Sequence, residues 1–164
     1  MKTIKVIIVA GMFCLTLLSF TQFSQGSKEV PYPYGYRKWM HIKTAIVGPK
    51  SPAFESTGGF HHIYANDKAV EGYKSNHFTN GAILVFDVLE AIDKDSDVLE
   101  GKRVWIGVMV KDDALYADTG GWGFEKFRED SKTERDTKDK AKQQCFSCHA
   151  IKKDNDFVFS KVRD

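Results

Sequence analysis

The sequence predicts a mainly β domain, an antiparallel sheet accompanied by a few short helices. Residues 82–89 and 104–110 are rich in β-branched and aromatic side chains, and apolar residues occupy alternate positions in both segments. Between them, residues 93–97 read Asp-Lys-Asp-Ser-Asp, a polar run that indicates a turn region. Two such segments joined by a polar turn are typical of an antiparallel hairpin, which is the clearest element of the predicted fold.

The segments before this hairpin are predicted to be short. Residues 30–36 form an extended N-terminal segment, because each of their two prolines disfavours helix at the residue before it. Residues 37–44 are expected to form a short helix. Residues 48–59, which contain two prolines, serine and glycine, are expected to form a loop. Residues 60–65 then predict a strand.

A second short helix is expected at residues 67–75, where Asn66 or Asp67 caps its first turn. After the hairpin, the glycines of residues 120–124 indicate a turn into a third clear strand. Residues 129–142 are rich in charge and are expected to be mostly solvated surface with some helix. The whole pattern therefore predicts a sheet with small helical additions rather than a helical bundle.

The first residues predict export from the cytoplasm. A short basic segment at 1–5 is followed by the apolar stretch 6–20, and small residues occur at 24–26. This order is typical of a secretory signal peptide at 1–26 followed by one domain at 27–164. An uncleaved N-terminal anchor is the alternative. In both cases the domain is expected to be periplasmic or secreted.

Charge and cysteine content both change when the signal peptide is removed. Loss of Lys2 and Lys5 reduces the basic residues from 24 to 22, which equals the 22 acidic residues, so the mature chain is formally neutral. This balance predicts no nucleic acid partner and, after signal cleavage, no membrane partner. Cys14 leaves with the signal, so Cys145 and Cys148 are the only cysteines of the predicted mature domain.

The segment Cys145-Phe146-Ser147-Cys148-His149 carries the strongest chemical signal. C-x-x-C-H is the attachment motif of haem c, in which two thiols form thioethers with the porphyrin vinyl groups and the histidine supplies the proximal iron ligand. A redox cysteine pair would be expected to open a helix after a strand, within a βαβ unit. A structural zinc site would need four ligands, and the sequence has no second cysteine pair. We therefore expect covalently attached haem c, with His149 as the metal ligand.

Several short motifs, taken in order, resemble the cytochrome P-460 and cytochrome c′-beta family. These motifs are Tyr36-Arg37-x-Trp39, Ile63-Tyr64-Ala65-Asn66, Phe78-x-x-Gly81-Ala82, Val108-Met109-Val110-Lys111-Asp112, Gly120-Gly121-Trp122-Gly123-Phe124, the haem motif itself and Asp156-Phe157-Val158-Phe159-Ser160. The resemblance implies a periplasmic, mainly β, usually homodimeric protein. It also implies one haem c bound through Cys145 and Cys148, with His149 below the iron.

Two functions divide this family. The P-460 members oxidise hydroxylamine and carry a lysine cross-linked to the haem, whereas the c′-beta members lack the cross-link and bind gases such as nitric oxide under an aromatic cap. The resemblance places the cross-linking position five residues after Gly81, at Phe86. A phenyl ring cannot form the nitrogen–carbon bond, so Phe86 favours the gas-binding branch, although it also fits a core position. Lys74 is the alternative if the register shifts.

The opposite side of the iron decides between ligand binding and electron transfer, because a sixth protein ligand favours the latter. On a strand, His61 and His62 point to opposite faces, so one of them is expected at the cofactor and the other at the surface or in the core. Phe60 and His61 join Phe86 as predicted cofactor-binding residues. The other candidate ligands are His41, His77, Met40 and Met109.

Three functions follow from these residues. The favoured one is a haem c protein that binds nitric oxide or a related nitrogen oxide at an open iron position. The first alternative is a hydroxylamine-oxidising enzyme that passes electrons to a soluble cytochrome, and the second is a six-coordinate electron carrier. The two alternatives require a redox partner protein. The sequence identifies no catalytic residue for any of them.

Overall fold

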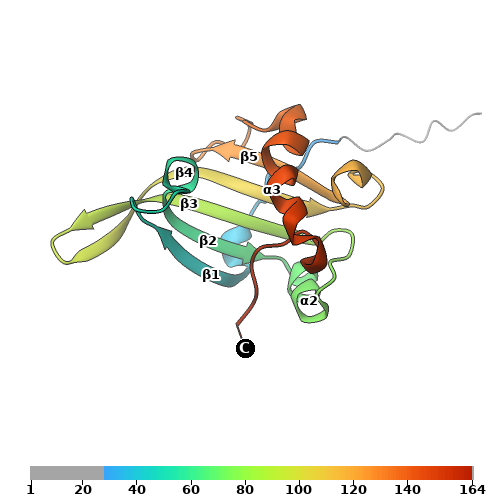
Figure 1. Ribbon diagram of the computed structural model, residues 1–164, viewed down its shortest axis with the longest axis horizontal. Coiled ribbons are helices and arrows are strands. Elements are labelled where there is room, and N and C mark those ends of the chain that lie inside the picture. Colours follow the sequence, from blue (N-terminus) through green and yellow to red (C-terminus); the bar gives the residue numbers. More distant parts are fainter. Residues whose placement is uncertain (1–27, 164) are drawn as a thin grey trace, which may run out of the picture.

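The computed structural model describes residues 28–163, so the predicted signal peptide at 1–26 lies outside the described residues. The domain is built on one five-stranded antiparallel sheet in the order β1-β2-β3-β4-β5, in which each strand pairs with its sequence neighbours (Figure 1). The strands are β1 Met40–Val47, β2 Gly59–Ala65, β3 Ile83–Lys94, β4 Asp97–Lys111 and β5 Trp122–Arg128. The predicted mainly β fold with a few short helices is confirmed.

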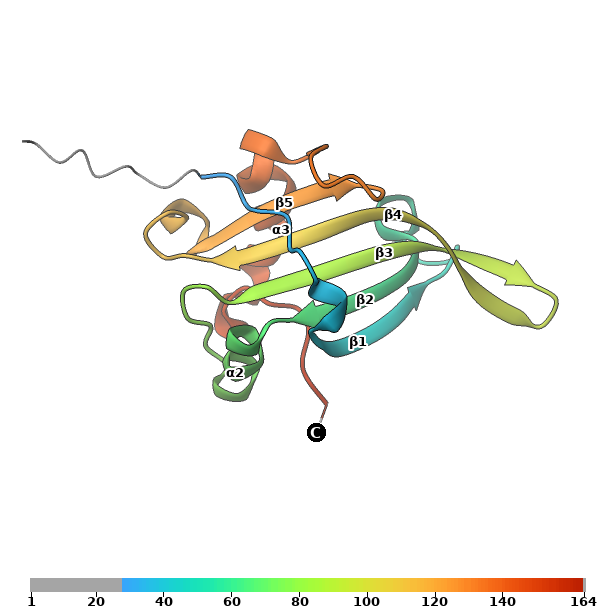
Figure 2. The ribbon, with the colours of Figure 1, turned by 180° about the vertical axis from the view of Figure 1, so that it is seen from behind.

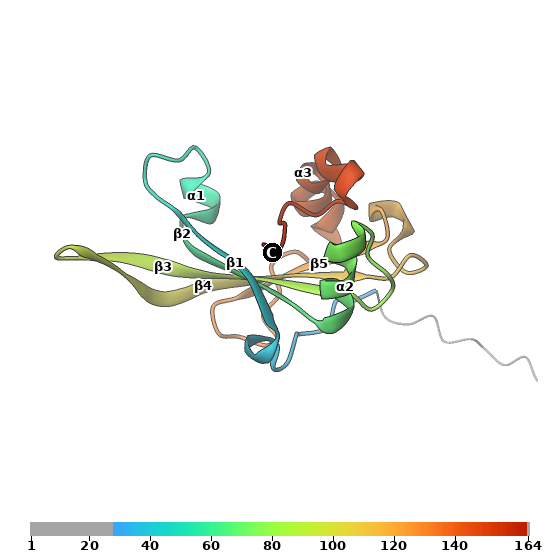
Figure 3. The same ribbon diagram turned by 90° about the horizontal axis from the view of Figure 1, so that it is seen from below.

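Helices lie on both faces of the sheet. They are η1 Tyr36–Lys38, α1 Phe54–Thr57, α2 Asp67–Ser75, η2 Ala117–Thr119, η3 Lys138–Lys140, η4 Lys142–Phe146, α3 Ser147–His149 and η5 Ala150–Asn155. Figure 3 shows α1 and α3 rising from one face, α1 towards the hairpin end and α3 towards the other end. The N-terminal segment and η1 cross the opposite face, as seen from behind in Figure 2. We call these the α3 face and the η1 face.

Strand alternation divides the core between the two faces, as a period of two residues requires. Leu84 of β3 and Phe124 of β5 belong to the cluster on the α3 face, while Val85 and Phe127 belong to the cluster on the η1 face. The partly buried residues packed against the α3-face cluster include Cys145 and Phe146, so the C-terminal helices close this half of the core. Within residues 28–163 no helix is long and apolar enough to span a membrane.

The predicted helix at residues 37–44 is wrong. Only the 3-10 turn Tyr36–Lys38 is helical, and the chain then enters β1, the edge strand that pairs with β2. β-branched residues such as Ile42 and Ile46 favour an extended chain once a partner strand is available. A register shift between His41 and Lys43 lets Ile42 become buried in the α3-face cluster. The predicted loop at 48–59 also contains the short helix α1.

The remaining elements follow the prediction closely. Asn66 caps α2 by accepting from the Ala69 backbone N–H at 3.0 Å, and the same oxygen accepts from the Ile83 N–H at 2.9 Å, which ties α2 to the start of β3. The β3–β4 hairpin is longer than predicted. Residues 91–100 are all exposed and extend beyond the neighbouring strands (Figure 1), with Asp95 in the left-handed region at φ 56°.

Candidate haem-attachment site

The C-x-x-C-H residues lie on one helical run above the α3 face. Cys145 falls in η4, and Cys148 and His149 follow in α3. Positions three apart on a helix share a side, so both thiols point to the same side of the run. Cys145 is half-buried in the α3-face cluster, Cys148 is exposed, and both are free thiols. Burial raises the pKa of the Cys145 thiol, while a hydrogen bond with Thr137 opposes the rise, so the protonated thiol is favoured at neutral pH.

His149 is oriented for metal binding through one nitrogen. Its Nδ1 lies 2.7 Å from the carbonyl oxygen of Phe157. Because a carbonyl oxygen only accepts, Nδ1 carries the proton and Nε2 keeps its lone pair, which is the arrangement of a metal-ligating histidine. The ring lies 5.0 Å from the rings of Phe124 and Phe159. Burial lowers the pKa of His149 against the opposing effect of the Phe157 hydrogen bond, which favours the neutral imidazole that a metal needs.

An aromatic row continues along the α3 face from Phe124 towards α1. Phe86 of β3 pairs with Gly107 of β4, which in turn pairs with Lys126 of β5. A Cβ at Gly107 would lie 3.0 Å from the Trp105 ring and 3.6 Å from Cβ of Phe86, so the glycine lets that indole lie over the sheet. The Phe86 and Trp105 ring centroids are 5.3 Å apart, and the Lys126 ammonium lies 4.4 Å from the Trp105 ring.

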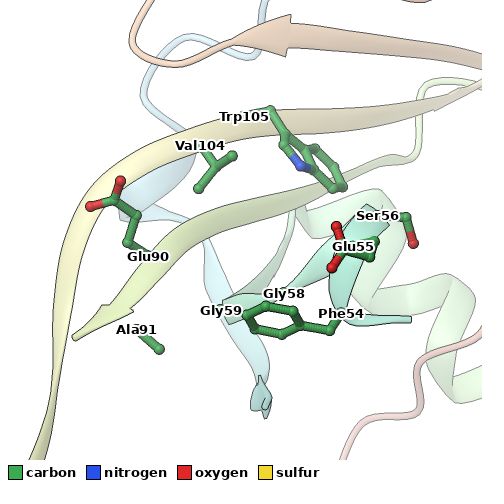
Figure 4. Close-up of a pocket in the computed structure, with 9 residues that line it drawn as sticks. All are labelled: Phe54, Glu55, Ser56, Gly58, Gly59, Glu90, Ala91, Val104 and Trp105. Atoms are coloured by element: carbon green, nitrogen blue, oxygen red, sulfur yellow. The ribbon is translucent and has the colours of Figure 1, made fainter. Parts of the chain in front are cut away.

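His61 extends this cluster onto β2. Its Nε2 donates to the carbonyl oxygen of Thr57 at the end of α1, and its ring meets Phe86 edge-on at 4.6 Å. Burial lowers the pKa of His61, and the bond to Thr57 opposes the shift, so the neutral ring is favoured at neutral pH. A pocket of about 280 Å³ opens beside this cluster, between α1 and the hairpin. Figure 4 shows the rings of Phe54 and Trp105 on its two sides.

The structure separates the predicted site residues into two groups. Cys145, His149, Phe86 and His61 all lie on the α3 side of the sheet. Phe60 lies on the opposite, η1 face, because neighbouring residues of β2 alternate between the faces and His61 is on the α3 face. There the ring of Phe60 stacks on that of His62. No contact of Phe60 within the described residues supports its predicted role in cofactor binding, because the cluster around Phe86 lies on the other face of the sheet.

The other candidate iron ligands are mostly remote from the site. His41 and His62 are both bonded to the Thr44 hydroxyl, at 2.8 and 2.9 Å. His77 and Met40 are exposed. Met109 packs against the α3-face cluster and pairs with Phe124, whose ring lies 5.0 Å from that of His149.

Two lysines lie on the α3 face that the sequence did not indicate as residues of the site. Lys111 is 4% exposed at its side chain and contacts Asp156, and Lys126 lies over Trp105. The only signal was the alternation of β4, since Lys111 continues the series Trp105, Gly107 and Met109. A lysine at the end of a strand is usually solvated, so this alternation alone did not indicate burial.

These residues fit a haem. Two free thiols one helical turn apart can form thioethers, and His149 offers Nε2 with its other nitrogen already satisfied. The neighbouring sheet surface carries the rings of Phe86, Trp105 and Phe124, which suit a flat apolar macrocycle. When bound, the haem supplies an iron that can hold small diatomic ligands or exchange one electron.

Comparison with known families identifies the family of the chain. The cytochrome P460 family model matches residues 33–160, which include every strand of the sheet and the C-x-x-C-H motif. A search of the curated proteins finds no significant match. The matched segment is well over half of the chain. The chain therefore belongs to the cytochrome P460 family and is a haem-binding cytochrome.

Proposed function

We propose that the chain is an exported haem c protein that binds nitric oxide or a related nitrogen oxide at an open iron position. Cys145 and Cys148 hold the haem covalently and His149 is its proximal ligand. The main observation that supports ligand binding is the cluster in which Phe86 packs between His61 and Trp105 on the α3 face. These rings lie on the sheet face that also carries Phe124, whose ring is 5.0 Å from that of His149. Apolar surroundings of this kind exclude water from a bound small ligand.

The contacts of the candidate sixth ligands support an open iron position. The Nε2 of His61 is already bonded to the Thr57 carbonyl, and its ring is wedged against Phe86. Met109 lies in the same sheet row as Phe124, whose ring contacts His149, and so it belongs to the proximal half of the site. A protein without a sixth ligand retains a coordination position for a small molecule, which favours ligand binding over simple electron transfer.

One observation favours the second candidate function, hydroxylamine oxidation with electron transfer to a soluble cytochrome. Lys74, the shifted-register lysine, is exposed and paired with Glu71 at 2.8 Å. Lys126, in contrast, lies on the α3 face. It is on β5 and pairs with Gly107 of β4, which pairs on its other side with Phe86 of β3. Within residues 28–163 its ammonium has no carboxylate partner and lies over Trp105. If a lysine of this chain is linked to the haem, we infer that it is Lys126, because the ammonium of Lys111 on the same face is held by Asp156.

Optical spectroscopy of the purified ferrous protein tests the proposal. Nitric oxide is expected to shift the Soret band of an otherwise five-coordinate spectrum. A strongly red-shifted Soret band, together with a haem peptide that contains Lys126 in mass spectrometry, would establish the hydroxylamine branch instead. Sharp six-coordinate bands that nitric oxide leaves unchanged would identify an electron carrier and overturn the proposal.

Phe86→Ala is expected to raise the association rate constant of nitric oxide about tenfold, equivalent to about 1.4 kcal/mol in the barrier. The physical reason is that loss of the ring removes the contacts to His61 and Trp105 and opens the site. Stopped-flow absorbance at the Soret band measures the rate. Tyr64→Ala is the matched control, since it removes a ring from the η1 face. Equal rates in the Phe86 variant and the unaltered protein would show that Phe86 is only core.

A further inference from the structure

Two successive residues after the haem motif have an unusual backbone. Asp156 and Phe157 adopt positive φ values of 46° and 64°, in the left-handed region that glycine prefers. For non-glycine residues such conformations cost on the order of 1–3 kcal/mol each and persist only where the surroundings impose them. Their position is informative, because they directly follow η5 and Phe157 contacts both His149 and Phe146 of the C-x-x-C-H motif.

The contacts of Asp156 explain how the first of these conformations is held. One carboxylate oxygen accepts from the Lys111 ammonium at 3.1 Å, and the other accepts from the Phe78 backbone N–H at 2.8 Å. Its main-chain carbonyl accepts from the Trp122 indole N–H at 2.9 Å. These three contacts fix Asp156 to the loop that follows α2, to β4 and to β5.

Phe157 is fixed by packing. A Cβ added at Gly120 would lie 2.4 Å from the Phe157 ring, so the ring fits against a residue that has no side chain. The centroid of the same ring lies 5.3 Å from that of Phe146 in the haem motif. Its backbone N–H donates to the Lys152 carbonyl at 2.8 Å. The direction of the Phe157 carbonyl is fixed by the next residue, because the Val158 N–H lies in the same planar peptide unit and donates to the Asn155 carbonyl at 3.0 Å.

That carbonyl is the acceptor of the His149 Nδ1 proton, at 2.7 Å. We propose that Asp156, held by Lys111, is a positioning residue for His149. The pair imposes the left-handed reversal, and the reversal directs the Phe157 carbonyl at the imidazole. A strong acceptor at Nδ1 fixes the ring orientation and increases electron donation from Nε2 to a metal. This inference rests on the proposed role of His149 as proximal ligand and is independent of nitric oxide binding.

Asp156→Asn is the sharpest test. Asparagine tolerates the left-handed conformation and can still accept from the Phe78 N–H, but it removes the charge that pairs Asp156 with Lys111. Lys111 then keeps its contacts to Asp113 at 3.2 Å and to the Gly120 carbonyl at 3.0 Å. We expect the iron–histidine stretching frequency of the ferrous protein to fall in resonance Raman spectra. We also expect the reduction potential to rise, by about 59 mV if the ferrous-to-ferric ratio changes tenfold. Lys111→Met is expected to shift both quantities in the same direction.

The double variant Asp156→Asn with Lys111→Met separates a shared pathway from two independent effects. It should shift the potential by less than the sum of the single variants, because both remove the same ion pair. Tyr73→Phe is the matched control. It breaks the 2.6 Å bond to Ser160, three residues beyond Phe157, and should leave the frequency and the potential unchanged.

Each outcome has a distinct meaning. Folded Asp156 and Lys111 variants with an unaltered stretching frequency and potential would overturn the inference. If Asp156→Asn does not fold, an unchanged Lys111→Met protein would overturn it equally. If the ferrous spectrum is five-coordinate and shows no iron–histidine band, the proposed role of His149 fails instead. If the ferrous protein is six-coordinate, the open iron position fails, and the reduction potentials of the variants alone decide the inference. A Tyr73→Phe protein that shifts like the Asp156 variant would show that the whole C-terminal segment acts, which also contradicts a specific role for this pair.

Discussion

Replacing Cys145 and Cys148 together by alanine is expected to leave no haem covalently attached to the chain. The two thiols are the only cysteines of residues 28–163, and their spacing is that of the attachment motif. After co-expression with a haem-attachment system, the unaltered protein should keep its haem through denaturing electrophoresis, and the double variant should lose it completely. Intact-mass measurement should show the mass of one haem in the first protein and none in the second.

The single variants and a matched control sharpen this test. Cys145→Ala and Cys148→Ala should each keep one thioether and give a pyridine haemochrome spectrum between those of haem b and haem c. Ser147→Ala changes the exposed residue between the thiols, whose hydroxyl donates to the Gln143 carbonyl at 2.7 Å, and should retain covalent haem in full. Covalent haem on the double variant, or none on the unaltered protein, would contradict the attachment chemistry.

The fold was predictable where the signal is local. Alternation in residues 82–89 and 104–110 reflects one-sided burial on each face, so the hairpin could be identified without knowing its neighbours. Residues 37–44 carry no such alternation, and their strand state depends on pairing with β2 across a loop. The bulge that buries Ile42 disturbs the period of two still further, which explains why this segment was predicted as a helix.

The site was predictable to the extent that side-chain chemistry defines it. C-x-x-C-H identifies the attachment residues because thiol and imidazole groups are rare and specific in their chemistry. The partner of His149 is a main-chain carbonyl, which every residue possesses, so no pattern could single out Phe157. Placement of Phe60 and His61 on opposite faces follows from strand alternation, but which face carries the cluster depends on where the C-terminal helices pack.

Asp87→Asn is expected to lower the free energy of unfolding by about 3–5 kcal/mol, the usual cost of removing one partner from a buried ion pair. The carboxylate is fully buried on the η1 face. It accepts from Arg103 at 2.7 Å, from the Tyr36 hydroxyl at 2.6 Å and from Arg37 at 3.0 Å. The variant leaves the mostly buried Arg103 guanidinium paired only with the exposed carboxylate of Asp130 among the described residues. Urea denaturation of the haem-loaded protein measures the difference.

Glu71→Ala is the matched control for charge removal at the surface. Glu71 pairs with Lys74 at 2.8 Å, but the two side chains are 70% and 64% exposed. Exposed pairs contribute about 0–1 kcal/mol, so this variant should unfold close to the unaltered protein. Similar losses in the Asp87 and Glu71 variants would show that the network around Asp87 contributes little beyond an ordinary surface pair.

The pH dependence of the Asp87 effect separates charge from packing. Burial alone would raise the pKa of Asp87, but the hydrogen bonds from Arg103 and Tyr36 outweigh it and hold the pKa below its usual range. Folding therefore favours the ionised carboxylate. Its contribution is present above the unfolded pKa of about 3.9 and is lost as the pH falls through the lower folded value. The stability difference between the unaltered protein and Asp87→Asn should accordingly be constant near neutrality and shrink in acid. A difference that persists unchanged in strong acid would mean that shape, not charge, holds the N-terminal segment to the sheet.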